Sequence, residues 1–292
     1  MNKIGIHYGY FTENWGTDII PLIKKVRALG FDILEVAPGP LLAKSKQERD
    51  MIAKAANDVG IELTFSVGLG KAYDLSSEDE KIRNNGIDFT LKTFDIMKEM
   101  GAKMYSGVNV GAWNNTPQDG IKDKSAELAR SVASIKEIMK VAEKYGITYA
   151  VEVVNRYEQS LLNTAEEAME YVKMVDSPNL KVLLDTYHMN IEEDSFEKAI
   201  KQVGNEYLGH FHVGESNRKP PSINGRMPWD EITTALKAIH YEGAIVMEPF
   251  IKMGGEVGRD IKVWRDISKN ATTEEMDYMA KESVQMLRDK MK

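Results

Sequence analysis

The stretch that decides the fold spans residues 149–190 and reads YAVEVVNRYEQSLLNTAEEAMEYVKMVDSPNLKVLLDTYHMN. It begins with a short apolar run at 149–154, and a second apolar run occupies 182–185. Between the two, residues 165–175 have apolar side chains at helical spacing and a helix-forming composition. This order predicts two parallel strands joined by a crossover helix.

The same unit repeats along the whole chain. Short apolar runs predict strands at 4–8, 33–37, 63–67, 104–108, 149–154, 182–185, 207–213 and 244–248. Amphipathic segments predict helices at 19–29, 46–59, 80–100, 126–145, 165–175, 196–203, 228–239 and 273–291. Eight such units in 292 residues predict an α/β fold, a single (β/α)8 TIM barrel, with one domain spanning residues 1–292. A doubly wound open sheet would normally have fewer strands, and GIHYGYFTENWG at residues 5–16 lacks the glycine spacing of a nucleotide-binding turn.

Helix boundaries also have sequence signals. Ser77, Thr164 and Thr273 each precede acidic residues and predict helix starts. Glycine directly follows four helical runs and predicts their ends, at Gly30, Gly60, Gly101 and Gly146.

The composition excludes several classes of protein. The chain has no cysteine, so a disulfide framework, a thiolate metal site and a thiol nucleophile are excluded, and any metal must bind His, Asp or Glu. With 38 Lys and Arg against 45 Asp and Glu, the net charge is −7 and no basic stripe is present, so no nucleic-acid partner is expected. The first fifteen residues lack a signal-peptide pattern, and no apolar stretch approaches the roughly 18 residues that a membrane span needs. We expect a soluble, cytoplasmic protein.

Polar side chains interrupt or end four successive predicted strands in the second half. They are Glu152, Asp185, His212 and Glu248. Parallel strands bring their carboxyl ends together at one end of a barrel, where active sites lie. Three carboxylates and one imidazole suit a divalent Mn, Co, Mg or Zn ion.

Each of these residues could instead have a structural role, such as capping a helix. No Lys or Arg occurs in the four runs before the polar residue, however, and several buried acids need a positive partner, so the metal site is favoured. His210 shares a strand face with His212 and could be a ligand, a support for a ligand or a packing residue. The longest connections follow predicted strands at 109–120, 215–226 and 251–269, where a barrel keeps its active site.

Several segments resemble one enzyme family closely. They are EVVNRYE at 152–158, LLDTYHMNIEEDSF at 183–196, GHFHVGESNR at 209–218, GRMPW at 225–229, VMEPF at 246–250 and GGEVGRDIKVWRD at 254–266. These motifs resemble the ketose 3-epimerases, and within that family the D-psicose (D-allulose) 3-epimerases, with D-tagatose 3-epimerase as a near relative. The similarity runs through the whole chain and is densest after residue 147.

The resemblance implies roles for twelve residues. Glu152, Asp185, His212 and Glu248 match the ligands of Mn2+ (Co2+ or Mg2+ being alternatives), and Glu152 and Glu248 also match the two glutamates that move the proton at C3. The residues that match those holding the O1 to O3 end of the ketose are Glu158, His188 and Arg218. Residues that stand where relatives line the pocket are His7, Ser66, Gly107, Val108 and Trp113, and His7 replaces an aromatic residue of many relatives. This replacement bears on substrate preference.

The chemistry agrees with these roles. The C–H bond beside a ketone is a very weak acid, so removing its proton requires the developing enediolate to be stabilised, which a divalent ion can do. Inverting the carbon requires an acid–base group on each face. The resulting prediction is C3 epimerisation between D-fructose and D-psicose, with other ketoses as alternatives.

Three other classes of protein are alternatives to an epimerase on this barrel. An aldose–ketose isomerase or inosose dehydratase could use the same barrel, but a hydride-shifting isomerase usually needs a two-metal site with more acids, and the sequence offers one ligand set. A zinc-cluster endonuclease would need more than the five histidines present. A non-catalytic sugar-binding barrel would not need two carboxylates at one carbon. The resemblance and the methionine-rich last helix, which includes Met279 and Met286, predict a homo-oligomer, a dimer or homotetramer.

Overall fold

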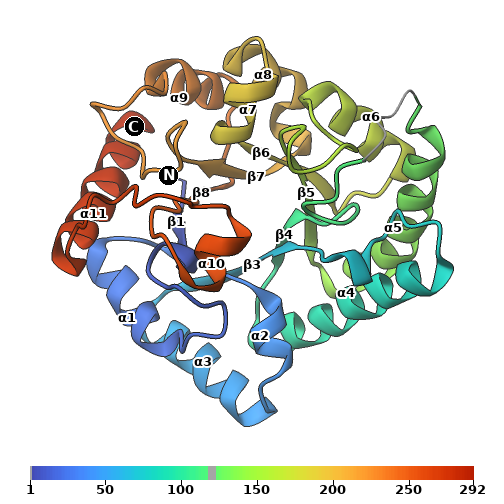
Figure 1. Cartoon of the computed structure of the whole chain (residues 1–292), viewed down its shortest axis with the longest axis horizontal. Coiled ribbons are helices and arrows are strands. Elements are labelled where there is room, and N and C mark those ends of the chain that lie inside the picture. The colour runs from blue at the N-terminus through green and yellow to red at the C-terminus, as the bar shows by residue number, and fades with distance from the viewer. Residues whose placement is uncertain (1, 118–122) are drawn as a thin grey trace.

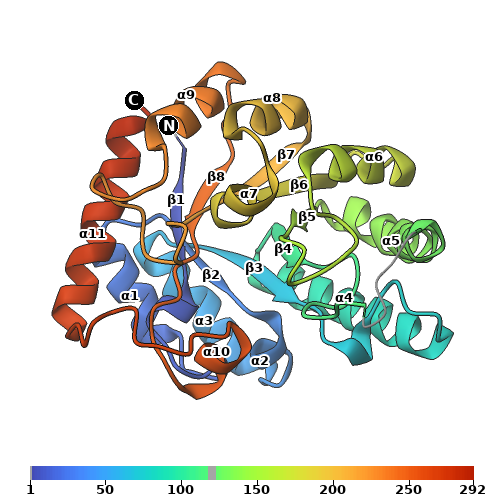
Figure 2. The ribbon, with the colours of Figure 1, turned by 45° about the horizontal axis from the view of Figure 1, so that its top comes forward.

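The computed structural model describes residues 2–117 and 123–292, and within them eight parallel strands close into a barrel in the order β1 to β8 (Figure 1). The strands are β1 Ile4–His7, β2 Ile33–Val36, β3 Glu62–Gly68, β4 Met104–Val108, β5 Thr148–Val153, β6 Leu180–Asp185, β7 Leu208–Val213 and β8 Ala244–Met247. β1 pairs with both β2 and β8, so the ring is complete, and Figure 2 shows β1 beside β8. The predicted (β/α)8 barrel is confirmed.

Helices surround the strands (Figure 1). The long ones are α1 Ile20–Leu29, α3 Lys46–Val59, α4 Glu80–Met100, α5 Ser125–Tyr145, α6 Ala165–Val175, α8 Phe196–Tyr207, α9 Trp229–Ala238 and α11 Thr273–Lys290. The short ones are α2 Pro38–Leu42, α7 Thr186–Glu192 and α10 Gly255–Asp260, with 3-10 turns η1 Tyr8–Tyr10 and η2 Lys71–Tyr73. The long helices match the predicted segments closely, whereas the short helices were not predicted.

Helix ends follow the sequence signals with two exceptions. Gly101 takes the left-handed conformation with a φ of 76° and ends α4, as predicted, and Thr164 caps α6. The cap of α4 is Asp79, not Ser77, whose side chain instead accepts a hydrogen bond from the Asp79 amide. The cap of α11 is Thr272, not Thr273.

The physical reason for the second difference lies three residues downstream. Glu275 stands at the third helical position after Thr272, and its carboxylate accepts a hydrogen bond from the Thr272 amide while the Thr272 side chain accepts one from Glu275. A start at Thr273 would place Met276 there, which cannot return the bond.

The apolar core lies between the strands and the helix ring. Phe94 of α4 shows the packing, because its ring meets Tyr105 of β4 at 5.5 Å and Tyr149 of β5 at 6.2 Å, edge to face in both cases. All three rings are buried. The helix is thereby fixed against two neighbouring strands.

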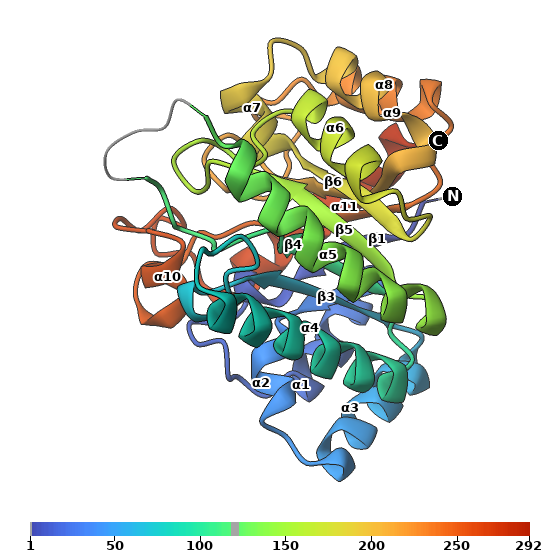
Figure 3. The same cartoon turned by 90° about the vertical axis from the view of Figure 1, so that its right-hand side faces the viewer.

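Strand register places the polar strand ends at one level. Asp185 of β6 is the Cα partner of His212 of β7, and Val213 is the partner of Met247, directly before Glu248. Figure 3 shows α7 and α10 at this carboxyl end of the barrel and both chain termini at the opposite end. In residues 2–117 and 123–292, no helix combines the length and apolar character required to cross a bilayer.

Candidate metal centre and adjoining pocket

The four predicted ligands converge at the carboxyl end of the barrel. Glu152, Asp185, His212 and Glu248 each offer a ligand atom, and these four atoms lie within 4.8 Å of one another. Nδ1 of His212 lies 3.9 Å from Glu152 Oε1, 4.0 Å from Asp185 Oδ2 and 3.8 Å from Glu248 Oε2. The imidazole thus faces all three carboxylates.

This arrangement fits one divalent ion. Nδ1 of His212 is buried and has no hydrogen-bond partner among the described residues. Its separations from the carboxylates are too long for hydrogen bonds, but two ligands about 2.1 Å from a shared ion lie up to about 4.2 Å apart. Three carboxylate oxygens and one imidazole nitrogen are a donor set that suits a hard or borderline divalent cation.

Burial makes the carboxylates unusual acids. It raises the pKa of Glu152 well above the usual range, and the nearby charge of Glu248 raises it further. Burial also raises the pKa of Glu248, to about 7, against the opposing charges of His212 and Arg218. For Asp185 burial has the same tendency, but Arg218 and His188 outweigh it and lower the pKa. A bound cation would favour the ionised form of all three.

Arg218 lies directly against the cluster. Its Nη1 donates hydrogen bonds to Asp185 Oδ2 at 3.1 Å and to Glu248 Oε2 at 2.9 Å, and its guanidinium stacks 3.9 Å above the ring of Tyr187. The residue has a φ of 62°, so the loop after β7 turns sharply to direct this side chain inward. Arg218 therefore supplies the positive charge that the four strand runs lack.

Asn155, directly after β5, holds two further predicted residues. The backbone N–H of Asn155 donates a hydrogen bond to His188 Nδ1 at 3.1 Å, and its side-chain Nδ2 donates one to Glu158 Oε1 at 3.0 Å. Arg218 Nη2, which can only donate, lies 3.3 Å from His188 Nε2, and the same ring nitrogen lies 3.7 Å from Glu152 Oε1. Burial lowers the pKa of His188 to about 4, so the ring is neutral at pH 7. Trp113 Nε1 donates to the other oxygen of Glu158 at 2.8 Å.

A pocket of about 350 Å³ opens beside the cluster. The predicted residues that line it are His7, Ser66, Val108, Trp113, Glu152, Glu158, His188, Arg218 and Glu248. Asp185 and His212 are buried and do not line it. Gly107 does not line it either. With a φ of 109°, and with a Cβ that would lie 2.2 Å from Val67 O, Gly107 is required for the close approach of β3 and β4.

His7 forms an aromatic part of the pocket wall. Its ring meets Phe250 at 5.4 Å and Trp15 at 6.0 Å, and its Nδ1 accepts a hydrogen bond from the Gly9 amide at 3.2 Å. Burial lowers the pKa of His7 to about 4. His7 is therefore neutral at pH 7.

The predicted long connections contribute to this pocket. Residues 109–117 provide Trp113, 215–226 provide Arg218, and 251–269 provide Asp260, whose Oδ2 accepts from Trp15 Nε1 at 2.9 Å. Positions 118–120 of the first connection lie outside the described residues.

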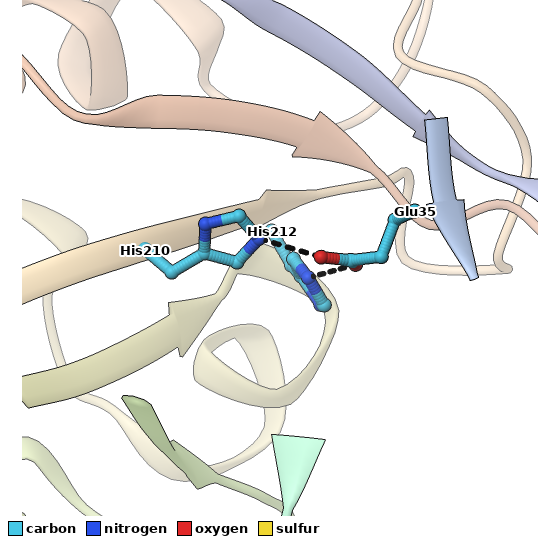
Figure 4. Close-up of side chains that lie close together, drawn as sticks. All are labelled: Glu35, His210 and His212. Carbon is cyan, nitrogen blue, oxygen red and sulfur yellow. Dashed lines mark hydrogen bonds and ion pairs between the residues drawn. The ribbon is translucent and has the colours of Figure 1, made fainter. Parts of the chain in front are cut away.

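Sequence reasoning missed one charged residue beside the ligands. Glu35 of β2 is fully buried, and its two oxygens face His210 and His212 (Figure 4). The signal was available, since Glu35 interrupts the apolar run ILEVA at 33–37 just as Glu152 interrupts its own run. His210 is not one of the four clustered residues, and its Nε2 lies 2.9 Å from Glu35 Oε2.

Comparisons with known proteins agree with this geometry. Residues 23–282 match the xylose isomerase-like TIM barrel family. The chain is 44% identical to a D-psicose 3-epimerase of Ruminiclostridium cellulolyticum, over 98% of this chain and 97% of the relative. It is 45% identical to a D-psicose 3-epimerase of Agrobacterium fabrum, over 97% of this chain and 96% of the relative. A crystal structure of D-psicose 3-epimerase with D-tagatose from Clostridium cellulolyticum H10 superposes with a TM-score of 0.95 at 42% identity, covering 99% of both chains. A structure of D-psicose 3-epimerase in the presence of D-fructose also gives 0.95, at 44% identity and the same coverage.

Proposed function

Because the chain belongs to the ketose 3-epimerases, isomerases built on the xylose isomerase-like TIM barrel, we propose that it interconverts D-fructose and D-psicose (D-allulose). The observation that carries the proposal is that Glu152 and Glu248 belong to one metal-binding cluster and also line the adjoining pocket. The relatives named D-psicose 3-epimerase support the choice of ketose.

The two glutamates would move the proton at C3. One carboxylate takes the proton from one face of the sugar carbon, the intermediate is an enediolate, and the other returns a proton to the opposite face. The roles exchange in the reverse direction. Burial raises the pKa of both glutamates, and a bound cation would favour the ionised form that can accept the proton.

A divalent ion held by Glu152, Asp185, His212 and Glu248 would supply Lewis-acid stabilisation of the negative charge that develops on the sugar. We propose Mn2+ as this ion, with Co2+ or Mg2+ as alternatives. The support is the donor set, which hard and borderline divalent ions share.

The remaining pocket residues would orient the ketose. Arg218, His188 and Glu158 present donors and an acceptor beside the two glutamates, where the O1 to O3 end must lie. At the far end we propose contacts from His7, Ser66, Val108 and Trp113, with Gly107 contributing through the backbone approach of β3 and β4. Fixed hydroxyl contacts would hold C3 between the two carboxylates.

A second substrate is supported by one comparison. A solved relative was crystallised with D-tagatose, so epimerisation of D-tagatose at C3 is the alternative activity. The proposed reaction type and residues are the same for both sugars.

We also propose that residues 1–292 form one cytoplasmic domain that self-associates into a dimer or tetramer. The absence of cysteine is compatible with a reducing compartment. Ile223 and Tyr278, which are 68% and 63% exposed, border the same groove as Met279 and Met286 of α11, and these four apolar side chains in an otherwise largely polar lining support contact with a second copy. Light scattering after size exclusion measures the number of chains.

The activity is tested by incubating the protein and Mn2+ with D-fructose in deuterated water. We expect D-psicose to form, with deuterium at C3 of both sugars by NMR. Absence of both products would exclude the proposal. D-tagatose, D-sorbose and L-ribulose assayed in parallel give the preferred ketose from their kcat/KM values.

A further inference from the structure

Glu35 is a buried charge outside the proposed catalytic set. It lies in β2, is 0% exposed and does not line the pocket. Its side chain extends into the barrel interior toward β7, as Figure 4 shows. A buried carboxylate requires partners of opposite charge or hydrogen-bond donors.

One oxygen of Glu35 is directed at a proposed metal ligand. Glu35 Oε1 lies 2.8 Å from His212 Nε2, an ion-pair distance, and neither atom has a hydrogen-bond partner elsewhere among the described residues. The opposite ring nitrogen, Nδ1, faces the three carboxylates at 3.8–4.0 Å. The two nitrogens of His212 thus face different partners.

This arrangement determines where the ring must carry its proton. A nitrogen that binds a metal ion carries no proton, so Nδ1 can be a ligand only while the remaining proton stays on Nε2. An acceptor beside Nε2 keeps the proton there, fixes the ring plane and raises the basicity of the ligand nitrogen.

Glu35 is itself fixed from three strands, of which β4 contributes the longest contact, from Ser106 Oγ to Oε2 at 3.4 Å. Thr64 Oγ1, on the Cα partner of Glu35 in β3, donates to Oε2 at 2.9 Å, and His210 Nε2 lies 2.9 Å from the same oxygen. The His210 ring also meets His212 edge to face at 5.0 Å. The orientation of Oε1 toward His212 is therefore defined by groups on β3, β4 and β7.

We propose that Glu35 is a positioning residue that holds His212 with Nδ1 toward the metal ion, and that His210 supports it through the second carboxylate oxygen. The inference rests on the metal site of the proposed function. The alternative is that Glu35, His210 and His212 hold a second ion of their own, because these three also form a cluster of possible ligands. Contacts of 2.8 and 2.9 Å leave space for a proton between each pair, which favours hydrogen bonding.

The test is Mn2+ affinity measured by calorimetry without sugar, for wild type and Glu35→Gln. The amide keeps the size of the side chain but loses its charge and one of its two acceptors. We expect the Kd for Mn2+ to rise about 10- to 100-fold, the usual effect of removing a partner of a metal-bound histidine.

Glu215→Gln is the matched control. Glu215 is another buried glutamate. Its carboxylate accepts hydrogen bonds from Arg226 N at 2.8 Å and Trp229 Nε1 at 2.9 Å, and no contact to His212 is found among the described residues. The Glu215→Gln variant should bind Mn2+ with a Kd within about threefold of the wild-type value, a smaller change than the one expected for Glu35→Gln. With saturating Mn2+, Glu35→Gln should regain most of kcat at an unchanged KM for D-fructose. Because Mn2+ also stabilises the folded state, circular dichroism of the metal-free variant is needed to show that it is folded before the metal is added.

The outcomes are distinguishable. If folded Glu35→Gln binds Mn2+ as tightly as wild type, the inference alone is overturned. Two Mn2+ ions per wild-type chain would instead assign Glu35, His210 and His212 to a second metal site. If wild type binds no Mn2+, the proposed function is overturned as well. If Glu35→Gln does not fold, wild type loaded with Mg2+ and carrying 15N-histidine gives the answer by NMR. We expect a protonated Nε2 and a metal-bound Nδ1 for His212, and the reverse assignment overturns the inference.

Discussion

Glu152 and Glu248 are alike in chemistry and differ in position. Both are buried, both have raised pKa values, and they come from β5 and from the residue after β8, which β6 and β7 separate in the ring. A sugar carbon between them would meet one carboxylate on each face. Epimerisation needs this arrangement because the proton leaves one face and returns to the other.

Replacing Glu248 by Gln should remove one of the two proton carriers. We expect kcat to fall by about 10³-fold, within the range that a general acid–base group contributes. The readouts are deuterium incorporation at C3 and bound Mn2+. Glu242→Gln, on the exposed surface before β8, is the control and should be fully active. An active Glu248→Gln enzyme would remove Glu248 from the mechanism.

His7 makes a separate prediction about acid stability. Its pKa is lowered by burial to about 4, below its ordinary value of 6.5, so the unfolded chain binds a proton that the folded protein does not between these values. Stability is therefore complete above about pH 6.5 and is lost as the pH falls toward 4. From this residue alone the loss between pH 7 and pH 5 is about 2 kcal/mol.

The measurement is urea unfolding of wild type and His7→Phe at the two pH values. The phenylalanine variant should lose about 2 kcal/mol less on acidification than wild type does. The lost hydrogen bond from Gly9 affects both pH values equally, so it cancels. An identical pH dependence in the two proteins would show that His7 does not titrate in this way.

At the scale of elements, the connections after β3, β4 and β5 form one side of the pocket together. The Trp113 ring lies over Gly68 at the end of β3, where an added Cβ would be 2.7 Å from the ring, and the indole donates to Glu158. A methyl group at position 68 must therefore displace Trp113. The proposed sugar contacts of this side depend on a glycine in a neighbouring strand.

Gly68→Ala should consequently weaken substrate binding. Overpacking costs about 1–3 kcal/mol, so we expect KM to rise about tenfold or more with a smaller change in kcat. Gly70→Ala is the matched control, because its Cβ would meet no atom within 4 Å. Steady-state kinetics of both variants gives the comparison, and equal KM values would mean that the position of Trp113 does not matter.

The sequence predicted the long elements well because each has a strong periodic signal. The predicted interval 46–59, for example, matches α3 to its end residues, with Gly60 ending it as predicted, and the structure adds a capping box at Ser45. The short helices α2, α7 and α10 have no comparable periodicity, because one or two turns contain too few residues to show an apolar face. Their formation depends on packing at the barrel end.

The same contrast applies within the site. Glu152, Asp185, His212 and Glu248 could be found because polar groups at successive strand ends must meet in a barrel. Glu35 contacts His212 from a strand distant in sequence, and Asn155 contacts His188 of α7 in the pocket wall. Such contacts follow from side-chain geometry, which one sequence does not contain. Gly107, which the resemblance places at the pocket, does not line it, and its φ of 109° instead allows the close approach of β3 and β4.

On the scale of the whole molecule, metal binding and barrel stability should be linked. The four proposed ligands come from the region of β5 to β8, so one ion would join four neighbouring strands that otherwise place three buried carboxylates together. A ligand that binds only the folded state stabilises it according to its concentration.

Mn2+ at about 100 times its Kd should stabilise the fold by about 2.7 kcal/mol, and EDTA should remove this increment. The melting temperature, followed by circular dichroism, reports the change. Asp185→Asn is the control, since it removes one ligand and should lose most of the metal response. A metal-independent melting temperature in wild type would contradict the link.

The residues of the pocket wall and those of the metal cluster come mainly from different halves of the chain. His7, Ser66, Val108 and Trp113 in the wall come from the first four βα units, whereas the clustered ligands and Arg218 come from the last four. Under the proposed roles, the far end of the sugar meets mainly the amino-terminal half, and the reacting carbon meets the carboxyl-terminal half, with Glu35 of β2 as the amino-terminal residue that supports the metal ligand His212. Laboratory evolution toward a new ketose can therefore vary His7, Ser66, Val108 and Trp113, provided that Glu35 and Thr64 are kept. Two parents of this family can exchange halves at the segment between β4 and β5 if both parents have this pair.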